Sequence, residues 1–79
     1  MSDNTERIRK EITILFNTTP QVRITVRQNR PKLELTDLPV QIVGVYENLF
    51  RVKDLTAPYP KYYTFSYADV WTGAVKVRR

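Results

Sequence analysis

The stretch TFSYADVWTG, from Thr64 to Gly73, constrains the fold of this chain more than any other. The β-branched and aromatic residues of Tyr62–Phe65 predict a half-buried strand that runs into it. Ser66 and Asp69 then have the spacing of a capping box, in which each side chain accepts a hydrogen bond from the backbone N–H of the other residue. The strand therefore ends at Ser66, in a capped turn.

The rest of this stretch predicts a tight corner. Ala68, Val70 and Trp71 give the turn an apolar underside, and Gly73 releases the chain into a last strand over 74–77. A strand, a single 3₁₀-like turn and another strand in so few residues are typical of small closed barrels. We interpret Ser66, Asp69, Val70 and Trp71 as a structural corner.

Length and composition favour one small domain spanning residues 1–79. A chain of 79 residues buries only about 60–65% of its unfolded surface, so the core must be single. It has no cysteine, which excludes disulfides and zinc thiolate sites and agrees with a cytoplasmic location. No apolar run approaches the roughly 20 residues of a membrane span, and the polar N-terminus lacks a signal-peptide core, so we expect no membrane contact.

A helix is predicted over residues 5–16, with Asp3 as its N-cap. Apolar residues recur on one face of this helix at helical spacing: Ile8, Ile12, Leu15 and Phe16. We expect the helix to lie across an open end of a barrel as a lid. A groove for a partner helix is the alternative.

Alternating residues predict five strands over 22–77. Val22, Ile24 and Val26 point to one side of the first strand, and the residues between them point to the other. A long second strand must bulge or lie at an edge at Pro39, and Gly44 relieves crowding where it bends. The predicted strands are 22–27, 32–46, 49–53, 62–65 and 74–77. The expected fold is mainly β, a small five-stranded barrel with an N-terminal α-helix.

The residue types favour a protein without catalytic activity. The absence of histidine and cysteine removes the commonest general base and the strongest nucleophile. Ser66 has only Asp69 as a neighbour in sequence to activate it, and Asp69 is better used in the cap. The carboxylates of Glu34 and Asp37 do not by themselves make an acid–base pair. No phosphate-binding loop, dinucleotide motif or metal-ligand cluster is recognisable, so we expect no cofactor and no metal.

A basic strip with nearby tyrosines is the main functional signal. The net charge of +5 favours a polyanion or an acidic protein as partner. Four cations fall on the first strand and the following turn, and tyrosines that suit stacking on single strands fall further along. The residues are Arg23, Arg27, Arg30, Lys32, Tyr59 and Tyr62. A solvated strand face beside half-buried tyrosines is the alternative interpretation.

Three segments resemble the Veg family of small bacterial proteins, called biofilm formation stimulators. The segment FSYADVWTGAVKV (residues 65–77) is similar to the family's SYADVLT segment and the strand after it. VYENLFRVK (45–53) resembles its tyrosine, short turn and aromatic strand, and RITVRQNRPKLEL (23–35) its basic hairpin. The chain differs by Trp71 where the family has leucine, by Asn29–Pro31 in the hairpin, and by the proline-rich loop over 54–61.

The resemblance implies an SH3-like or Sm-like barrel and a regulatory role without catalysis. It implies that the protein stimulates biofilm matrix gene expression through contact with a transcriptional regulator. A nucleic-acid-binding barrel that regulates expression directly through the basic strip is the alternative. Both a monomer and a homodimer remain open.

Overall fold

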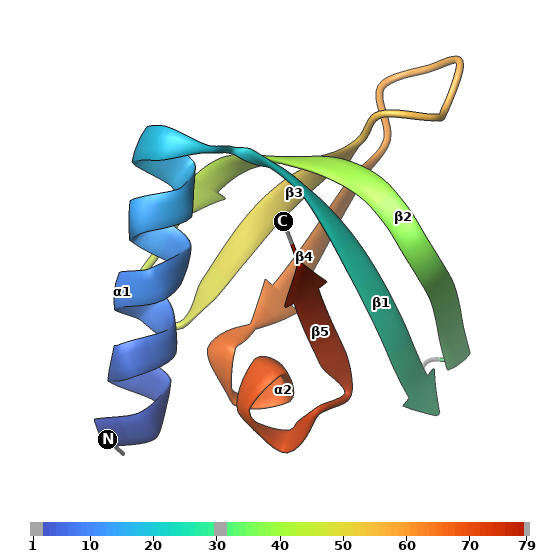
Figure 1. The fold of residues 1–79 in the computed structure, drawn as a ribbon. Coiled ribbons are helices and arrows are strands. Elements are labelled where there is room, and N and C mark those ends of the chain that lie inside the picture. The colour runs from blue at the N-terminus through green and yellow to red at the C-terminus, as the bar shows by residue number, and fades with distance from the viewer. Residues whose placement is uncertain (1–2, 30–31, 79) are drawn as a thin grey trace.

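The computed structural model describes residues 3–29 and 32–78, which form two helices and one five-stranded antiparallel sheet (Figure 1). The predicted Arg30 lies outside the described residues. In chain order the elements are α1 (Asp3–Thr18), β1 (Gln21–Asn29), β2 (Lys32–Val45), β3 (Leu49–Asp54), β4 (Tyr62–Ser66), α2 (Tyr67–Thr72) and β5 (Val75–Arg78).

The sheet is strongly curved and open. Its strand order is β4-β3-β2-β1-β5, so β4 and β5 are the two edges and β1 pairs with both β2 and β5. The predicted five strands and N-terminal helix are confirmed. The predicted closed barrel is corrected to an open sheet, because no hydrogen-bonded ladder joins β4 to β5 among the residues described.

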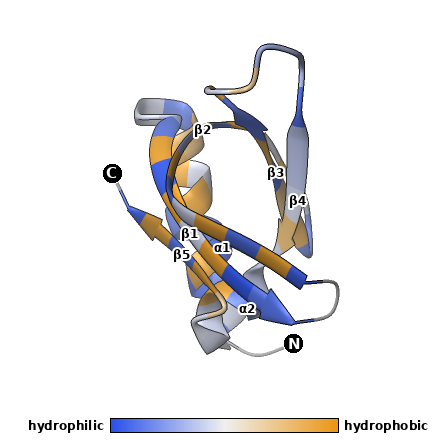
Figure 2. Cartoon of the chain, turned by 90° about the vertical axis from the view of Figure 1, so that its right-hand side faces the viewer, coloured by the Kyte–Doolittle hydropathy of each residue, from blue (hydrophilic) through white to orange (hydrophobic). Residues whose placement is uncertain are grey.

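The core lies on the concave side of the sheet. Hydrophobic and hydrophilic residues alternate along β1 and β2 (Figure 2), because successive side chains of a strand point to opposite faces. Val22, Ile24 and Val26 are buried as predicted, and Phe50 and Val52 of β3 join them. The intervening residues of β1 are left on the convex face, where the predicted strip lies.

Two bulges bend β2. Thr25 of β1 faces both Thr36 and Asp37, and Asp37 adopts a positive φ of 49°. The predicted irregularity at Pro39 therefore falls just before the proline. The Pro39 carbonyl accepts a hydrogen bond from the Leu55 N–H (3.1 Å), so the backbone polar groups of Pro39 point toward the β3 side and away from β1. Pro39 lies one residue beyond Val40, where the β2–β3 ladder ends. The missing proline N–H thus costs no ladder hydrogen bond.

The helix α1 is longer than the predicted 5–16. Ile8 and Ile12 belong to the core and Leu15 packs against it, as the apolar stripe predicted. Phe16 was wrongly placed in that stripe, because its side chain is exposed in the last turn of the helix. α1 contacts β2 and α2, so it packs beside the curved sheet.

The corner after β4 contains an α-helix instead of the predicted 3₁₀-like turn. The Asp69 N–H donates to Ser66 Oγ (3.1 Å), which is the one capping-box bond formed within the described chain, and Gly73 ends α2 with a positive φ of 90°. Val70 packs against the core, but Trp71 is 57% exposed, which corrects its predicted place underneath the turn. The buried aromatic is Tyr67, whose ring stacks on that of Phe50 (centroids 5.7 Å apart).

Asp54 anchors the loop that joins β3 to β4. Its Oδ1 accepts from the Thr56 N–H (2.8 Å) and from the Thr56 hydroxyl (2.7 Å), and its own N–H donates to the Lys61 carbonyl (2.8 Å). The hydrogen bonds from Thr56 lower the pKa of Asp54 below its usual value. The loop is thus held at its base.

Candidate functional site

The predicted strip lies on the convex face of β1 and β2. Arg23 and Arg27 project outward from β1 and are exposed, as the alternation predicted. Lys32 begins β2 and pairs with Asn29, next to these arginines on the same face. Glu34 pairs with Arg27 across the two strands, so a carboxylate also lies within the strip.

The edge strand β5 adds two cations that the sequence analysis missed. Lys76 pairs with Thr25 of β1, and Arg78 pairs with Arg23, so both lie on the convex face. The alternation of VKVR over residues 75–78 would have shown that these cations point outward. Only the pairing of β5 with β1 reveals that they join the strip. We call Arg23, Arg27, Lys32, Lys76 and Arg78 the basic face.

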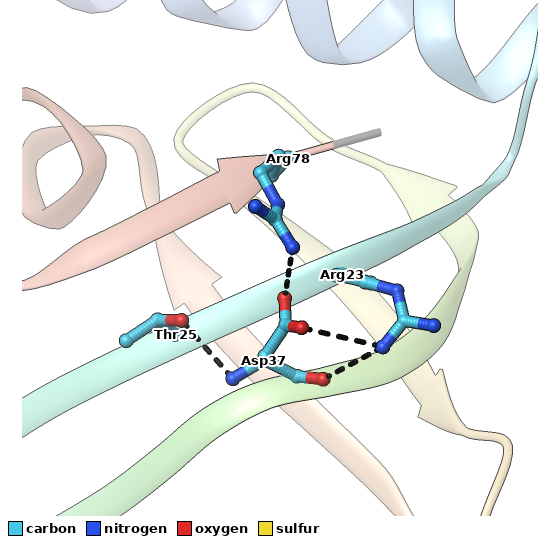
Figure 3. A network of polar contacts seen from close by, with 4 residues as sticks. All are labelled: Arg23, Thr25, Asp37 and Arg78. Carbon is cyan, nitrogen blue, oxygen red and sulfur yellow. Dashed lines mark hydrogen bonds and ion pairs between the residues drawn. The ribbon is translucent and has the colours of Figure 1, made fainter.

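Asp37 ties the three strands of the basic face together (Figure 3). Arg78 donates to its Oδ1 at 2.9 Å from β5, and Arg23 approaches its Oδ2 at 3.3 Å and its carbonyl oxygen at 3.4 Å from β1. The Asp37 N–H donates to the hydroxyl of Thr25 (3.1 Å), which holds the bulge in place. Two of the cations therefore share one carboxylate, while Arg27, Lys32 and Lys76 have no carboxylate within 4.0 Å among the described residues.

The predicted tyrosines do not join this face. Tyr59 is exposed in the loop between β3 and β4, and Tyr62 lies on β4, at the opposite edge of the sheet from β5. Two strands, β2 and β3, separate Tyr62 from Arg27. The structure therefore divides the predicted site into two surfaces.

Tyr62 instead belongs to a second surface on the convex side of β2, β3 and β4. The guanidinium carbon of Arg51 lies 4.3 Å from the centroid of the Tyr62 ring, which is a cation–π contact. Tyr46, at the end of β2, lines the same shallow groove as these two residues, together with Leu49. We call Tyr46, Arg51 and Tyr62 the aromatic row.

Gly44 makes room for the first member of the row. It pairs with Arg51 at the second bulge of β2, where Val43 is the extra residue. A Cβ at Gly44 would lie 2.6 Å from the Tyr46 hydroxyl oxygen and 2.9 Å from two of its ring carbons. The ring of Tyr46 therefore lies directly over Gly44, beside Arg51. The bend predicted at Gly44 is present, and the missing side chain also seats a tyrosine.

Tyr67 supports the turn that carries Tyr46. Its hydroxyl donates to the Tyr46 carbonyl oxygen at 2.6 Å, and the Tyr46 N–H donates to the Leu49 carbonyl at 2.9 Å across the turn. Burial raises the pKa of Tyr67, so the hydroxyl stays protonated as a donor at neutral pH. Tyr67 thus holds the backbone of Tyr46 from the concave side.

Neither surface has the residues of a metal centre. Within residues 3–29 and 32–78, no group of three or more acidic, histidine or cysteine side chains comes together to hold a metal ion. Over the same residues, no helix has the length and apolar character needed to cross a membrane. What the two surfaces offer is charge and flat aromatic area.

Comparison with known proteins gives no relative from which to transfer a function. Neither the scan against protein-family models nor the search of curated proteins found a match to this chain.

Proposed function

We propose that this protein is a non-enzymatic module that binds nucleic acid through its basic face. The observation that carries the proposal is the register of β5 on β1, which sets Arg78 beside Arg23 and Lys76 beside Thr25. Neighbouring strands lie about 4.8 Å apart, so cations from three strands share one continuous surface. Phosphates along one nucleic acid backbone match such a surface.

The three cations without an ion-pair partner set the expected strength. Arg27, Lys32 and Lys76 are exposed, and each neutralises one phosphate in our proposal. Contact with about three phosphates gives a slope of log K against log salt of about −2 to −3. Binding is therefore micromolar or weaker and depends strongly on salt.

Fluorescence anisotropy with labelled oligonucleotides at about 50 and 200 mM salt tests this function. We expect the double variant Arg27→Glu/Lys76→Glu to lose at least about tenfold in affinity at the lower salt, because phosphates then meet two carboxylates. The matched control is Arg7→Glu/Lys10→Glu, which makes the same charge change on exposed positions of α1. Equal losses in the two variants would mean that only net charge matters.

Regulation through contact with a transcriptional regulator is the second candidate, in line with the resemblance to biofilm formation stimulators. Exposed apolar side chains on α1 support it: Ile14 is 61% exposed and lines a groove with Phe16 and Val45. The lack of cysteine agrees with a cytoplasmic setting.

A reporter of biofilm matrix gene expression in a bacterial host separates the two candidates. Under the second candidate, Ile14→Glu abolishes stimulation and Arg27→Glu/Lys76→Glu keeps it. Under the first, the outcome is reversed.

A further inference from the structure

The aromatic row differs from the basic face in having a cation that lies over an aromatic ring. Within the part of the chain that the structure describes, Arg51 has no carboxylate partner within 4.0 Å, and its guanidinium lies over the Tyr62 ring. Glu47, in the turn after β2, also lines the groove. Arginine is planar and stacks on flat rings, so the pair presents a flat cationic surface.

The row is built into the sheet. Tyr46, Arg51 and Tyr62 come from or beside three adjacent strands, and the bulge at Gly44 seats the first ring next to the guanidinium. Tyr46 is 52% exposed and Tyr62 43% exposed, although both are large aromatic residues. Rings held on a rigid sheet lose little conformational entropy when a ligand stacks on them.

The groove has room for a nucleobase, and a second cation lies beside it. Its volume is about 610 Å³, and Asn48 and Thr64 add polar groups to its lining. Lys53 pairs with Tyr62 across β3 and β4, so the two side chains project from neighbouring positions on the same face. A base on the row therefore brings its own phosphate close to Lys53.

We propose that the aromatic row binds unpaired bases of a single-stranded nucleic acid by stacking. Base stacking on an aromatic side chain tolerates any sequence, because every base has a flat face, and nearby cations hold the backbone. This inference rests on the proposed function and deepens it, since it specifies single strands as the ligand. Duplexes, whose bases are already stacked, bind only the basic face.

The test compares a labelled dT12 strand, an rU12 strand, a 12-mer of abasic sites and a 12-base-pair duplex at about 50 mM salt. We expect Tyr62→Ala to weaken binding of dT12 or rU12 at least about fivefold, as loss of one stacked base does elsewhere. Tyr62→Phe keeps the ring and should bind as the wild type does. The matched control is Tyr59→Ala, an exposed tyrosine outside the groove. The abasic strand and the duplex should not distinguish any of these variants.

The outcomes separate this inference from the proposed function. Loss on Tyr62→Ala for the strands with bases, and not for the abasic strand, supports the row. If Tyr62→Ala binds as the wild type does and Arg27→Glu/Lys76→Glu loses affinity, stacking on the row is overturned and phosphate binding by the basic face stands. If Tyr62→Ala loses affinity and Arg27→Glu/Lys76→Glu does not, only binding by the basic face is overturned. If the protein binds none of the oligonucleotides, both proposals are overturned.

Discussion

The basic face and the aromatic row occupy the same convex side of one sheet, yet two cations of the basic face are paired with a carboxylate and the cation of the row is paired with a ring. On the basic face, Arg23 and Arg78 share the carboxylate of Asp37, and Glu34 sits opposite Arg27. In the row, Arg51 rests on the ring of Tyr62. A cation paired with a carboxylate must give up that partner to hold a phosphate, whereas a cation on a ring keeps its partner when it binds one. The number of cations on a face is therefore a poor guide to how many phosphates that face can bind.

The largest expected effect comes from removing the support of the row. Tyr67→Ala should lower the free energy of unfolding by about 3–5 kcal/mol, because a buried ring packed on Phe50 is lost. Tyr67→Phe should cost only about 1 kcal/mol, the hydrogen bond to the Tyr46 carbonyl. Urea denaturation measures both. If Tyr67→Phe is as damaging as Tyr67→Ala, the hydroxyl and not the ring holds the corner.

Removing the Asp37 carboxylate should leave Arg23 and Arg78, like Arg51, without a carboxylate partner among the described residues. Asp37→Asn keeps a residue type that tolerates the positive φ of 49° and frees Arg23 and Arg78. We expect tighter duplex binding, by about three- to tenfold at 50 mM salt, and a steeper salt slope by about one to two. Anisotropy against a duplex measures both quantities. Unchanged affinity would mean that these arginines do not contact phosphate.

Low pH should reduce the stability that Asp54 gives to the loop between β3 and β4. The pKa of Asp54 is lower in the folded protein than its usual value of 3.8, so its contribution to stability is full above about pH 4. That contribution is lost as the pH falls through the lower, folded pKa. Asp54→Asn should therefore melt about 4–8 °C below wild type at pH 7, if the hydrogen bonds are worth about 1 kcal/mol, and the gap should narrow at pH 3. A gap that is the same at both pH values would exclude the carboxylate charge as its cause.

The smallest effect on stability should come from Gly44→Ala, although it disturbs the row. The added Cβ displaces the ring of Tyr46, whose end is exposed and free to move, so we expect the free energy of unfolding to change by less than about 1 kcal/mol. Binding of dT12 should weaken, while duplex binding stays as in wild type. A matched loss for both ligands would show that the substitution acts on the fold and not on the row.

The parts of the fold that could be predicted are those set by residues close together in the sequence. The alternation of Val22, Ile24 and Val26 fixes which face of β1 is buried, and the spacing of Ser66 and Asp69 fixes the start of α2. Both depend on residues close in sequence. The placement of Trp71 beneath the turn was wrong, and Tyr67 was overlooked, because the aromatic that is buried depends on where Phe50 lies in three dimensions.

The candidate site was predictable only in part, for the same reason. Arg23 and Arg27 were placed correctly on the outer face of β1 by alternation. The ion pair of Arg23 with Asp37 and the addition of Lys76 depend on strand pairing between distant segments. Tyr62 was a correct candidate for an exposed ring, but its neighbour Arg51 follows only from the register of β3 on β4.

The two surfaces should form at different stages of folding, because their contacting residues are separated by different lengths of chain. Strands β2, β3 and β4 pair as consecutive hairpins, so the residues of the row come together by closing only short connections. The bond between Arg78 and Asp37 closes a separation of 41 residues, which costs more chain entropy. We therefore expect β5 to dock after the hairpins have formed, and its amides to exchange with solvent sooner than those of β3. A folding intermediate of this protein would carry a complete aromatic row before its basic face existed.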